Sequence, residues 1–254
     1  MFRFVYLIVA SIITSPVFAT TFDLIDENSR VVGHNIIVYS HEEDTLLDIA
    51  RRFDLGYSEI VNANPDLDPW LPGTGKKVLV PNRFILPDAE KKGIVINLAE
   101  MRLYYYPTRK KNQLQQVVTH PIGVGREGWT TPLGKTRITQ KKKDPTWTPP
   151  ASIHAEHLEK GDPLPKVVPA GPDNPLGAYA MRLAMPGYLL HGTNRPYGVG
   201  LRVSHGCIRL FPEDIEHLFG IVPVNTPVEI LYQPYKAALH ENALYIEAHE
   251  VQGD

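Results

Sequence analysis

The pattern of apolar and polar positions near the N-terminus predicts a small unit that begins with a strand and a helix. A short apolar run at residues 36–39 predicts the strand. The apolar positions that follow recur at the spacing of one helical face, namely Leu46, Ile49, Ala50 and Phe53. The pattern Thr45-x-x-Asp48 resembles a capping box at the start of this helix, and Gly56 is expected to end it.

A second short helix and a second strand complete the unit. The helix is predicted over residues 58–63, because Pro65 disfavours helical geometry in the residue before it. The apolar run at residues 78–81 predicts the closing strand. Residues 35–82 are therefore expected to form a compact strand-helix-helix-strand domain.

From Gly93 onward the pattern is mainly that of strands. Five strands are predicted, at residues 94–97, 101–105, 116–119, 188–190 and 228–231. Residues 212–219 predict a short helix, with Pro212 at its first position and Gly220 as its stop. The polar residues 233–254 are interpreted as a C-terminal extension in which residues 243–246 could add an edge strand.

Residues 144–176 contain eight prolines and little periodicity, so no regular element is expected there. An irregular stretch of this length inside a compact domain is usually functional or disordered. We interpret the segment as a rigid excursion over a binding cleft. A passive surface loop is the alternative.

The composition of the chain does not favour nucleic acid as a binding partner. The chain has 254 residues and a formal net charge of −2, so it has no overall basic field to attract nucleic acid. The N-terminus resembles a secretory signal, with Arg3 before an apolar run and the small-residue site Val17-Phe18-Ala19 before Thr20. We therefore expect cleavage after residue 19, export to the periplasm, and no transmembrane anchor in the processed chain. A retained membrane anchor is the alternative.

Cys207 is the only cysteine in the chain, and export would place it in an oxidising compartment without a partner in the chain. It lies in the string Ser204-His205-Gly206-Cys207-Ile208-Arg209-Leu210, which follows Leu190-His191-Gly192-Thr193. A neighbouring imidazole lowers the pKa of a thiol and carries its proton, so the pattern favours nucleophilic catalysis. Gly206 permits close approach of substrate to backbone N–H groups.

Three other interpretations of this cluster are open. His191, His205 and Cys207 are all zinc-ligand types, although the separation of the last two is short for two ligands and no carboxylate signature accompanies them. A redox thiol would require a resolving cysteine, and an inert core would bury polar groups at a cost. For the base we favour His191, because a strand end allows it to reach Cys207 from a neighbouring strand.

The pattern His-x-Gly-Thr, a spacer and Ser-His-Gly-Cys-Ile-Arg-Leu resembles the active-site signature of the YkuD-type L,D-transpeptidases. The resemblance extends upstream through residues 122–125 and 129–134 and covers about residues 93–232. With a signal and a small N-terminal unit, it is closest to the periplasmic ErfK/YbiS/YcfS/YnhG group. It implies a mostly β fold, with an antiparallel, β-sandwich-like catalytic domain.

The resemblance also implies roles for single residues. Cys207 matches the nucleophile, and His191 matches the base that later protonates the leaving amine. Gly192 would orient the imidazole through its carbonyl, and the N–H groups of Gly206 and Cys207 would form the oxyanion hole. His205 would line the pocket.

Two further residues of the signature are assigned to substrate binding. Arg209 would hold a substrate carboxylate through its planar guanidinium, although a surface salt bridge is the alternative. Ser204 is likewise expected to contact substrate. No cofactor or metal is expected.

Residues 35–82 resemble a LysM domain in their element order and in Asp44-Thr45-Leu46, Asn62-Ala63-Asn64-Pro65 and Leu71-Pro72-Gly73. The resemblance implies a shallow glycan groove between the first strand and helix and the loop before the second strand. His41-Glu42-Glu43 departs from the usual turn, so the groove residues are undefined. A spacer module without ligand is the alternative.

Together, the resemblances imply a cysteine L,D-transpeptidase that acts on peptidoglycan stem peptides and glycan. Cys207 would displace D-alanine from a tetrapeptide, and the acyl group would pass to a diaminopimelate amine or to the terminal lysine of an outer-membrane lipoprotein. Transfer to water would make the protein an L,D-carboxypeptidase. Carbapenems are the expected inhibitors. A non-catalytic peptidoglycan-binding protein and a sortase-like transpeptidase are the rival classes.

Overall fold

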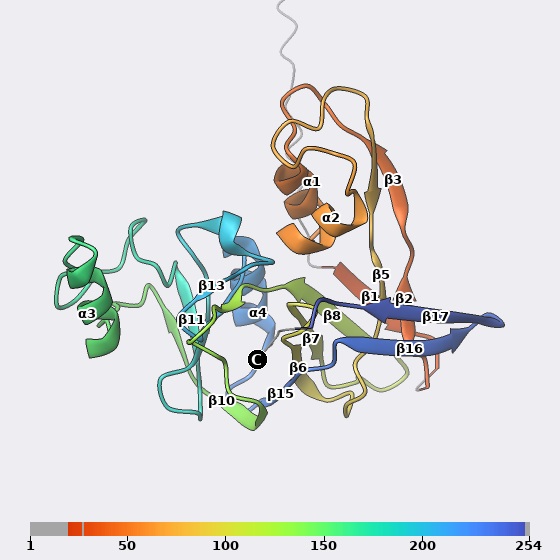
Figure 1. Ribbon diagram of the computed structural model, residues 1–254. Helices are drawn as coiled ribbons and strands as arrows, with labels where there is room; N and C mark the ends of the chain where they lie inside the picture. The colour runs from red at the N-terminus through yellow and green to blue at the C-terminus, as the bar shows by residue number, and fades with distance from the viewer. Residues whose placement is uncertain (1–19, 27, 252–254) are drawn as a thin grey trace, which may run out of the picture.

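The largest element of the fold is a nine-stranded sheet (Figure 1). The computed structural model describes residues 20–26 and 28–251, so the predicted signal peptide lies outside the described residues. The strands follow the order β1 (Thr20–Leu24), β8 (Gln115–Pro121), β7 (Arg102–Tyr106), β6 (Gly93–Asn97), β15 (Pro227–Leu231), β10 (Gly134–Lys143), β11 (Tyr179–Leu183), β12 (Leu189–His191) and β14 (Ile208–Arg209).

The sheet is mixed, which corrects the expectation of an antiparallel domain. β6 pairs with β15 in parallel, and β12 pairs with β14 in parallel. The second pair is parallel because residues 192–207 carry the chain back to the start of β12 before β14 begins. This connection includes a single turn at Pro196–Gly198 and the strand β13 (Arg202–Ser204), which pairs with β9 (Val124–Gly125).

One apolar core brings together residues from both halves of the sheet, so the domain is sandwich-like although its sheet is continuous. β6 contributes Ile94 and Ile96, while β12 and β14 contribute Leu190 and Ile208. The helix α4 (Pro212–Ile221) also packs into this core. As predicted, Pro212 is its first residue, but the helix runs past Gly220 by one residue.

The predicted strand-helix-helix-strand unit is confirmed. It consists of β3 (Ile36–Tyr39), α1 (Leu46–Arg52), α2 (Tyr57–Ala63) and β4 (Lys77–Val80). Thr45 caps α1 in a complete capping box. The prediction for Gly56 is wrong: α1 ends at Arg52, Asp54 then takes a positive φ of 56°, and Gly56 is the N-cap of α2.

This unit shares its core with the large sheet. One apolar cluster joins Leu46 and Ile60 of the helices to Val95, Tyr104 and Val117 of β6, β7 and β8. All five residues of β6 and of β7 are buried. One face of these strands contacts the apolar core that includes Leu190 and Ile208, and the other face contacts the small unit. Residues 35–82 therefore form a unit in sequence without a separate core.

The C-terminal extension is part of the fold as well. It contains the hairpin of β16 (Tyr235–His240) and β17 (Ala243–Ala248), which lies against β5 (Arg83–Ile85), the partner of β2 (Val31–Gly33). Lys236 is buried in this contact, where it forms ion pairs with Glu100 and Glu247.

The proline-rich segment has more structure than expected, because it contains the nine-residue helix α3 (Ala151–Glu159). Asn174 holds the rest of the segment together. Its amide nitrogen donates to the carbonyls of Pro145 and Pro169 at 2.8 and 2.9 Å, and its oxygen accepts the Leu176 N–H at 2.9 Å. The expectation of a fixed excursion is consistent with this network.

Arg102 is the main polar link between the small unit and the sheet. Its side chain is 0% exposed, its Nε and Nη2 each donate to Glu59 of α2 at 2.8 Å, and Nη2 also donates to the Asp54 carbonyl at 2.9 Å. A second, more exposed link joins Arg51 of α1 to Glu213 of α4 at 2.6 Å.

The small unit also contacts the backbone of Gly200, in the connection between β12 and β14. The Ser58 hydroxyl donates to the Gly200 carbonyl at 2.7 Å, and a Cβ placed on Gly56 would lie only 2.7 Å from the Gly200 Cα. A side chain at residue 56 would therefore push the small unit away from residues 192–207.

Replacing Arg102 by methionine should lower the free energy of unfolding by about 3–5 kcal/mol, because it leaves Glu59 without its buried partner. Arg51→Met is the matched control and should cost less than about 1 kcal/mol, since that pair is partly solvated. Urea denaturation of both variants measures the difference. Equal losses would contradict the assignment of Arg102 as the main link.

Candidate active site

The parallel pairing of β12 with β14 brings the two parts of the predicted site together. Leu190 lies opposite Ile208, and His191 lies opposite Arg209. Leu190 and Ile208 both point into the core. Because side chains alternate along a strand, His191 and Arg209 lie on the other face, and Cys207 is expected to share it.

His191 is held as a neutral imidazole with a fixed orientation. Its side chain is buried, and Nδ1 lies 2.6 Å from the carbonyl oxygen of Gly192, as the resemblance implied. Burial and, to a smaller extent, the charge of Arg209 lower the pKa of His191 to about 3, against hydrogen bonds to the backbone of Gly192 and Leu176 that raise it. With Nδ1–H donating to Gly192, Nε2 is the ring nitrogen that can accept a proton.

Cys207 is a protonated thiol at neutral pH. Burial raises the pKa of this thiol, against smaller opposing effects from the Leu189 backbone and the Arg209 charge. The thiol contacts the carbonyl of Gly187 at 3.6 Å, in the loop between β11 and β12. The resting site is therefore a thiol and a neutral imidazole, without an ion pair.

The turn before Cys207 is fixed by Ser204. The Ser204 hydroxyl accepts the Gly206 N–H at 3.1 Å and donates to the Cys207 carbonyl at 2.6 Å. This side chain is 1% exposed and both of its hydrogen bonds lie inside the turn, so it fixes the backbone around Cys207, and its expected contact with substrate stays a prediction. Gly206 has a φ of +96°, which a residue with a side chain rarely adopts.

The same hydrogen bond bears on the expected oxyanion hole. The Gly206 N–H already has a partner in Ser204, so it would have to leave that hydroxyl to bind a developing oxyanion. The Gly206 carbonyl is also engaged, because it accepts the Thr131 hydroxyl at 2.8 Å. The role of Gly206 as a donor stays a prediction.

His205 belongs to a separate polar cluster that reaches into the proline-rich segment. Its Nε2 lies 3.0 Å from a carboxylate oxygen of Glu156 on α3 and 3.1 Å from Arg126. Glu156 also pairs with Arg126, and the Trp129 ring packs edge-on against His205 at 4.7 Å. His205 is therefore oriented by other side chains, which favours His191 as the base.

Arg209 carries a half-buried positive charge beside these residues. Its Nε is buried and has no hydrogen-bond partner within the described part of the chain. Burial lowers the pKa of this guanidinium, and the charge of Arg195 acts in the same direction. Both effects favour an anionic ligand at this position, so the alternative of a surface salt bridge is not supported.

The zinc interpretation has no geometric support over residues 20–26 and 28–251. Two groups of acidic and histidine side chains have converging ligand atoms there, one around His120 and one around His249. Neither group includes Cys207. Sequence reasoning missed Glu156, and an acidic residue in a proline-rich segment carries no signal that could have identified it.

The family model of the YkuD L,D-transpeptidase catalytic domain matches residues 91–230. Among curated proteins, the probable L,D-transpeptidase YbiS of Escherichia coli K12 is 46% identical over 91% of this chain and 75% of its own length. The probable L,D-transpeptidase YcfS of the same strain is 44% identical over 92% and 74%.

Solved structures give a more distant match. The catalytic domain of the Enterococcus faecium L,D-transpeptidase acylated by ertapenem is 25% identical, with a TM-score of 0.40. The match covers 57% of this chain and 100% of that one.

Alkylation of Cys207 by iodoacetamide should rise continuously with pH, without a plateau between about pH 5 and pH 8. The reason is that a raised thiol pKa leaves less thiolate at neutral pH than an ordinary cysteine has, whereas a cysteine-histidine ion pair would stay reactive in acid. Mass spectrometry measures the rate at the single cysteine, and the urea-unfolded chain is the control. A low-pH plateau in the folded protein would show that the resting site is an ion pair.

Proposed function

The chain belongs to the YkuD family of L,D-transpeptidases, and we propose that Cys207 and His191 carry out a two-step acyl transfer on peptidoglycan stem peptides. The observation that carries the proposal is the pairing of β12 with β14, together with the bond from His191 Nδ1 to the Gly192 carbonyl. These features make Nε2 of His191 the proposed proton acceptor, on the face where Cys207 is expected.

The first step forms a thioester. Cys207 Sγ attacks the carbonyl of the third residue of a tetrapeptide stem while His191 Nε2 takes the thiol proton. The C–N bond to D-alanine then breaks, and the same proton passes from His191 to the leaving amine. Because the resting thiol and imidazole are both neutral, proton transfer accompanies the attack.

Arg209 is the proposed site for a carboxylate of the donor stem. Its half-buried guanidinium has a buried, unpartnered Nε and lies beside His191 in the strand register. A bidentate bond to a carboxylate would satisfy it and would neutralise its charge. The Cys207 N–H and, after release from Ser204, the Gly206 N–H are the proposed donors to the oxyanion.

The second step transfers the acyl group to an amine. The acceptor amine attacks the thioester carbonyl and gives a proton to His191 Nε2. The C–S bond then breaks, and His191 passes that proton to the Cys207 sulfur to restore the thiol. A diaminopimelate side chain would yield a 3→3 crosslink, and a lipoprotein lysine would yield an attached lipoprotein. Water as acceptor would give L,D-carboxypeptidase activity.

We further propose that the βααβ unit is a LysM-like domain that binds glycan at one end. Ser40 is buried there and ties the loop after β3 to the loop before β4, through the carbonyl of Gly73 and the N–H of Lys76. Trp70 and Leu71 of the second loop are exposed, and both of their N–H groups donate to Asp68. An exposed indole on a fixed loop is suited to packing against a sugar ring.

The proposed site of action is the periplasm. The expected signal in residues 1–19 supports export. In the described ranges, no helix has the length and apolar character needed to cross a membrane.

Incubation with a carbapenem should add one drug mass to the wild-type protein and none to Cys207→Ala, because the thiol opens the β-lactam as it would attack the stem. His191→Gln should slow the adduct by about 10²–10⁴-fold. His205→Gln is the matched control and should slow it by less than about tenfold, since His205 contacts Glu156 and Arg126. Intact-protein mass spectrometry follows the rate.

An adduct on folded Cys207→Ala would contradict the assigned nucleophile, and a larger loss for His205→Gln than for His191→Gln would reverse the assigned base. Muropeptide analysis after incubation with sacculi separates the three acceptors. Crosslinked, lipoprotein-linked and trimmed products correspond to the diaminopimelate, lysine and water pathways respectively.

Trp70→Ala should reduce retention of the full chain on insoluble peptidoglycan by at least about threefold, because it removes the exposed ring of the proposed groove. The Cys207→Ala background prevents covalent capture. Leu158→Ala on α3 is the control for an exposed apolar residue elsewhere. The full chain is required, since the small unit shares its core with the sheet. Unchanged retention would exclude Trp70 from glycan binding.

A further inference from the structure

We propose that Asp54 is the binding site for the α-ammonium group of Thr20, which forms when the leader is cleaved after Ala19. The inference rests on the predicted cleavage and does not depend on the proposed chemistry at Cys207. The Thr20 nitrogen lies 3.0 Å from Asp54 Oδ2. Cleavage would therefore convert a neutral amide at this position into a cation beside a carboxylate.

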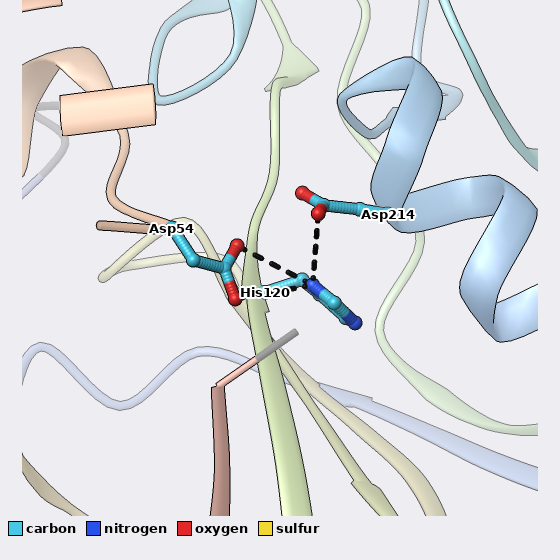
Figure 2. A group of neighbouring side chains, drawn as sticks. All are labelled: Asp54, His120 and Asp214. Carbon is cyan, nitrogen blue, oxygen red and sulfur yellow. Dashed lines mark hydrogen bonds and ion pairs between the residues drawn. The ribbon is translucent and has the colours of Figure 1, made fainter. Parts of the chain in front are cut away.

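The carboxylate belongs to a buried cluster at the junction of the small unit and the sheet (Figure 2). Asp54 follows α1, His120 is on β8 and Asp214 is on α4, and they are 2%, 0% and 3% exposed. His120 Nδ1 lies between the two carboxylates, 3.3 Å from each.

In the unprocessed chain, the cations nearest this cluster already have other partners. Arg51 bonds Glu213, and Arg102 bonds Glu59. His217, whose ring lies 5.8 Å from that of His120, adds no cation because burial lowers its pKa.

The cluster itself contains two carboxyl groups and one imidazole. Burial lowers the pKa of His120, but Asp54 and Asp214 raise it by more, to about 10. Burial and the Asp54 charge raise the pKa of Asp214 to about 7, against the charge of His120, which is the effect expected where one cation serves two carboxyl groups. A second cation beside Asp54 would favour ionisation of both carboxyl groups.

Thr20 is held where it can supply that charge. β1 pairs with β8 so that Thr20 lies opposite Thr119, the residue before His120. Hydrolysis of the peptide bond between Ala19 and Thr20 by a leader peptidase adds hydroxide from water to the Ala19 carbonyl carbon. The Thr20 nitrogen gains the remaining proton and, at neutral pH, a second proton from solvent.

The backbone conformation of Asp54 does not by itself explain why this residue is an aspartate. Its φ is 56°, in the left-handed region, where glycine or asparagine would close the turn after α1 equally well. The carboxylate is not needed for that turn. It instead contacts the Thr20 nitrogen and His120.

A metal ion is the competing occupant, because the ligand atoms of Asp54, His120 and Asp214 lie within 4.8 Å of one another. The α-ammonium is favoured for two reasons. The Thr20 nitrogen is already in hydrogen-bond contact with Asp54, and a single ammonium group needs only that one carboxylate as its partner.

The test compares full processed chains that begin at Thr20 with chains that begin at Ala19, each with Asp54 and with Asp54→Asn. With Asp54, the Thr20 form should have an unfolding equilibrium constant about tenfold smaller than that of the Ala19 form, because a charged hydrogen bond replaces a neutral one. The Asp54→Asn pair should differ by less than about twofold. Urea denaturation monitored by circular dichroism measures all four constants.

A second readout follows the amine itself. Reaction of the Thr20 α-amine with acetic anhydride, located by peptide mass spectrometry, should be at least about fivefold slower with Asp54 than with Asp54→Asn in the folded protein. The terminus of the exported protein is determined first. Cleavage at another bond, equal stability of the Thr20 and Ala19 forms, or stoichiometric Zn²⁺ retained by the Thr20 form but lost in Asp54→Asn would each overturn the proposal, whether or not Cys207 accepts a carbapenem.

Discussion

The parallel pairing of β12 with β14 is the constraint on which the active site depends. It places His191 opposite Arg209 and turns Leu190 and Ile208 into the core. A shift of one residue would turn the core pair out and the polar pair in, so burial of the core pair fixes the site. The geometry of the polar face is thus set by apolar packing behind it.

This parallel arrangement requires a long connection between the two strands. A parallel pair needs a crossover, and here residues 192–207 serve as that crossover without a long helix. Ser204 and Gly206 then close the turn into the second strand. Cys207 consequently lies between a turn that is fixed by hydrogen bonds and a strand that is fixed by packing of Ile208 in the core.

Local signals in the sequence were sufficient for much of the fold. The capping box at Thr45 and the proline at the start of α4 predicted helix starts, because each acts within a few residues. The Ser-His-Gly-Cys string likewise pointed to Cys207, the proposed nucleophile. Features that depend on distant partners were not predicted, including the parallel pairs and the contact of Glu156 with His205. The spacing of charges in the sequence does not specify which ones meet.

The contact between Gly56 and Gly200 limits how the two parts of the protein can evolve. The small unit resembles a module that recombination could exchange between genes. Yet its helix α2 contacts residues 192–207, which join β12 to β14, and its core is completed by the large sheet. A small unit taken from another protein would need substitutions that match the large sheet and residues 192–207, which it contacts. The two parts are therefore expected to diverge together, as one unit of selection.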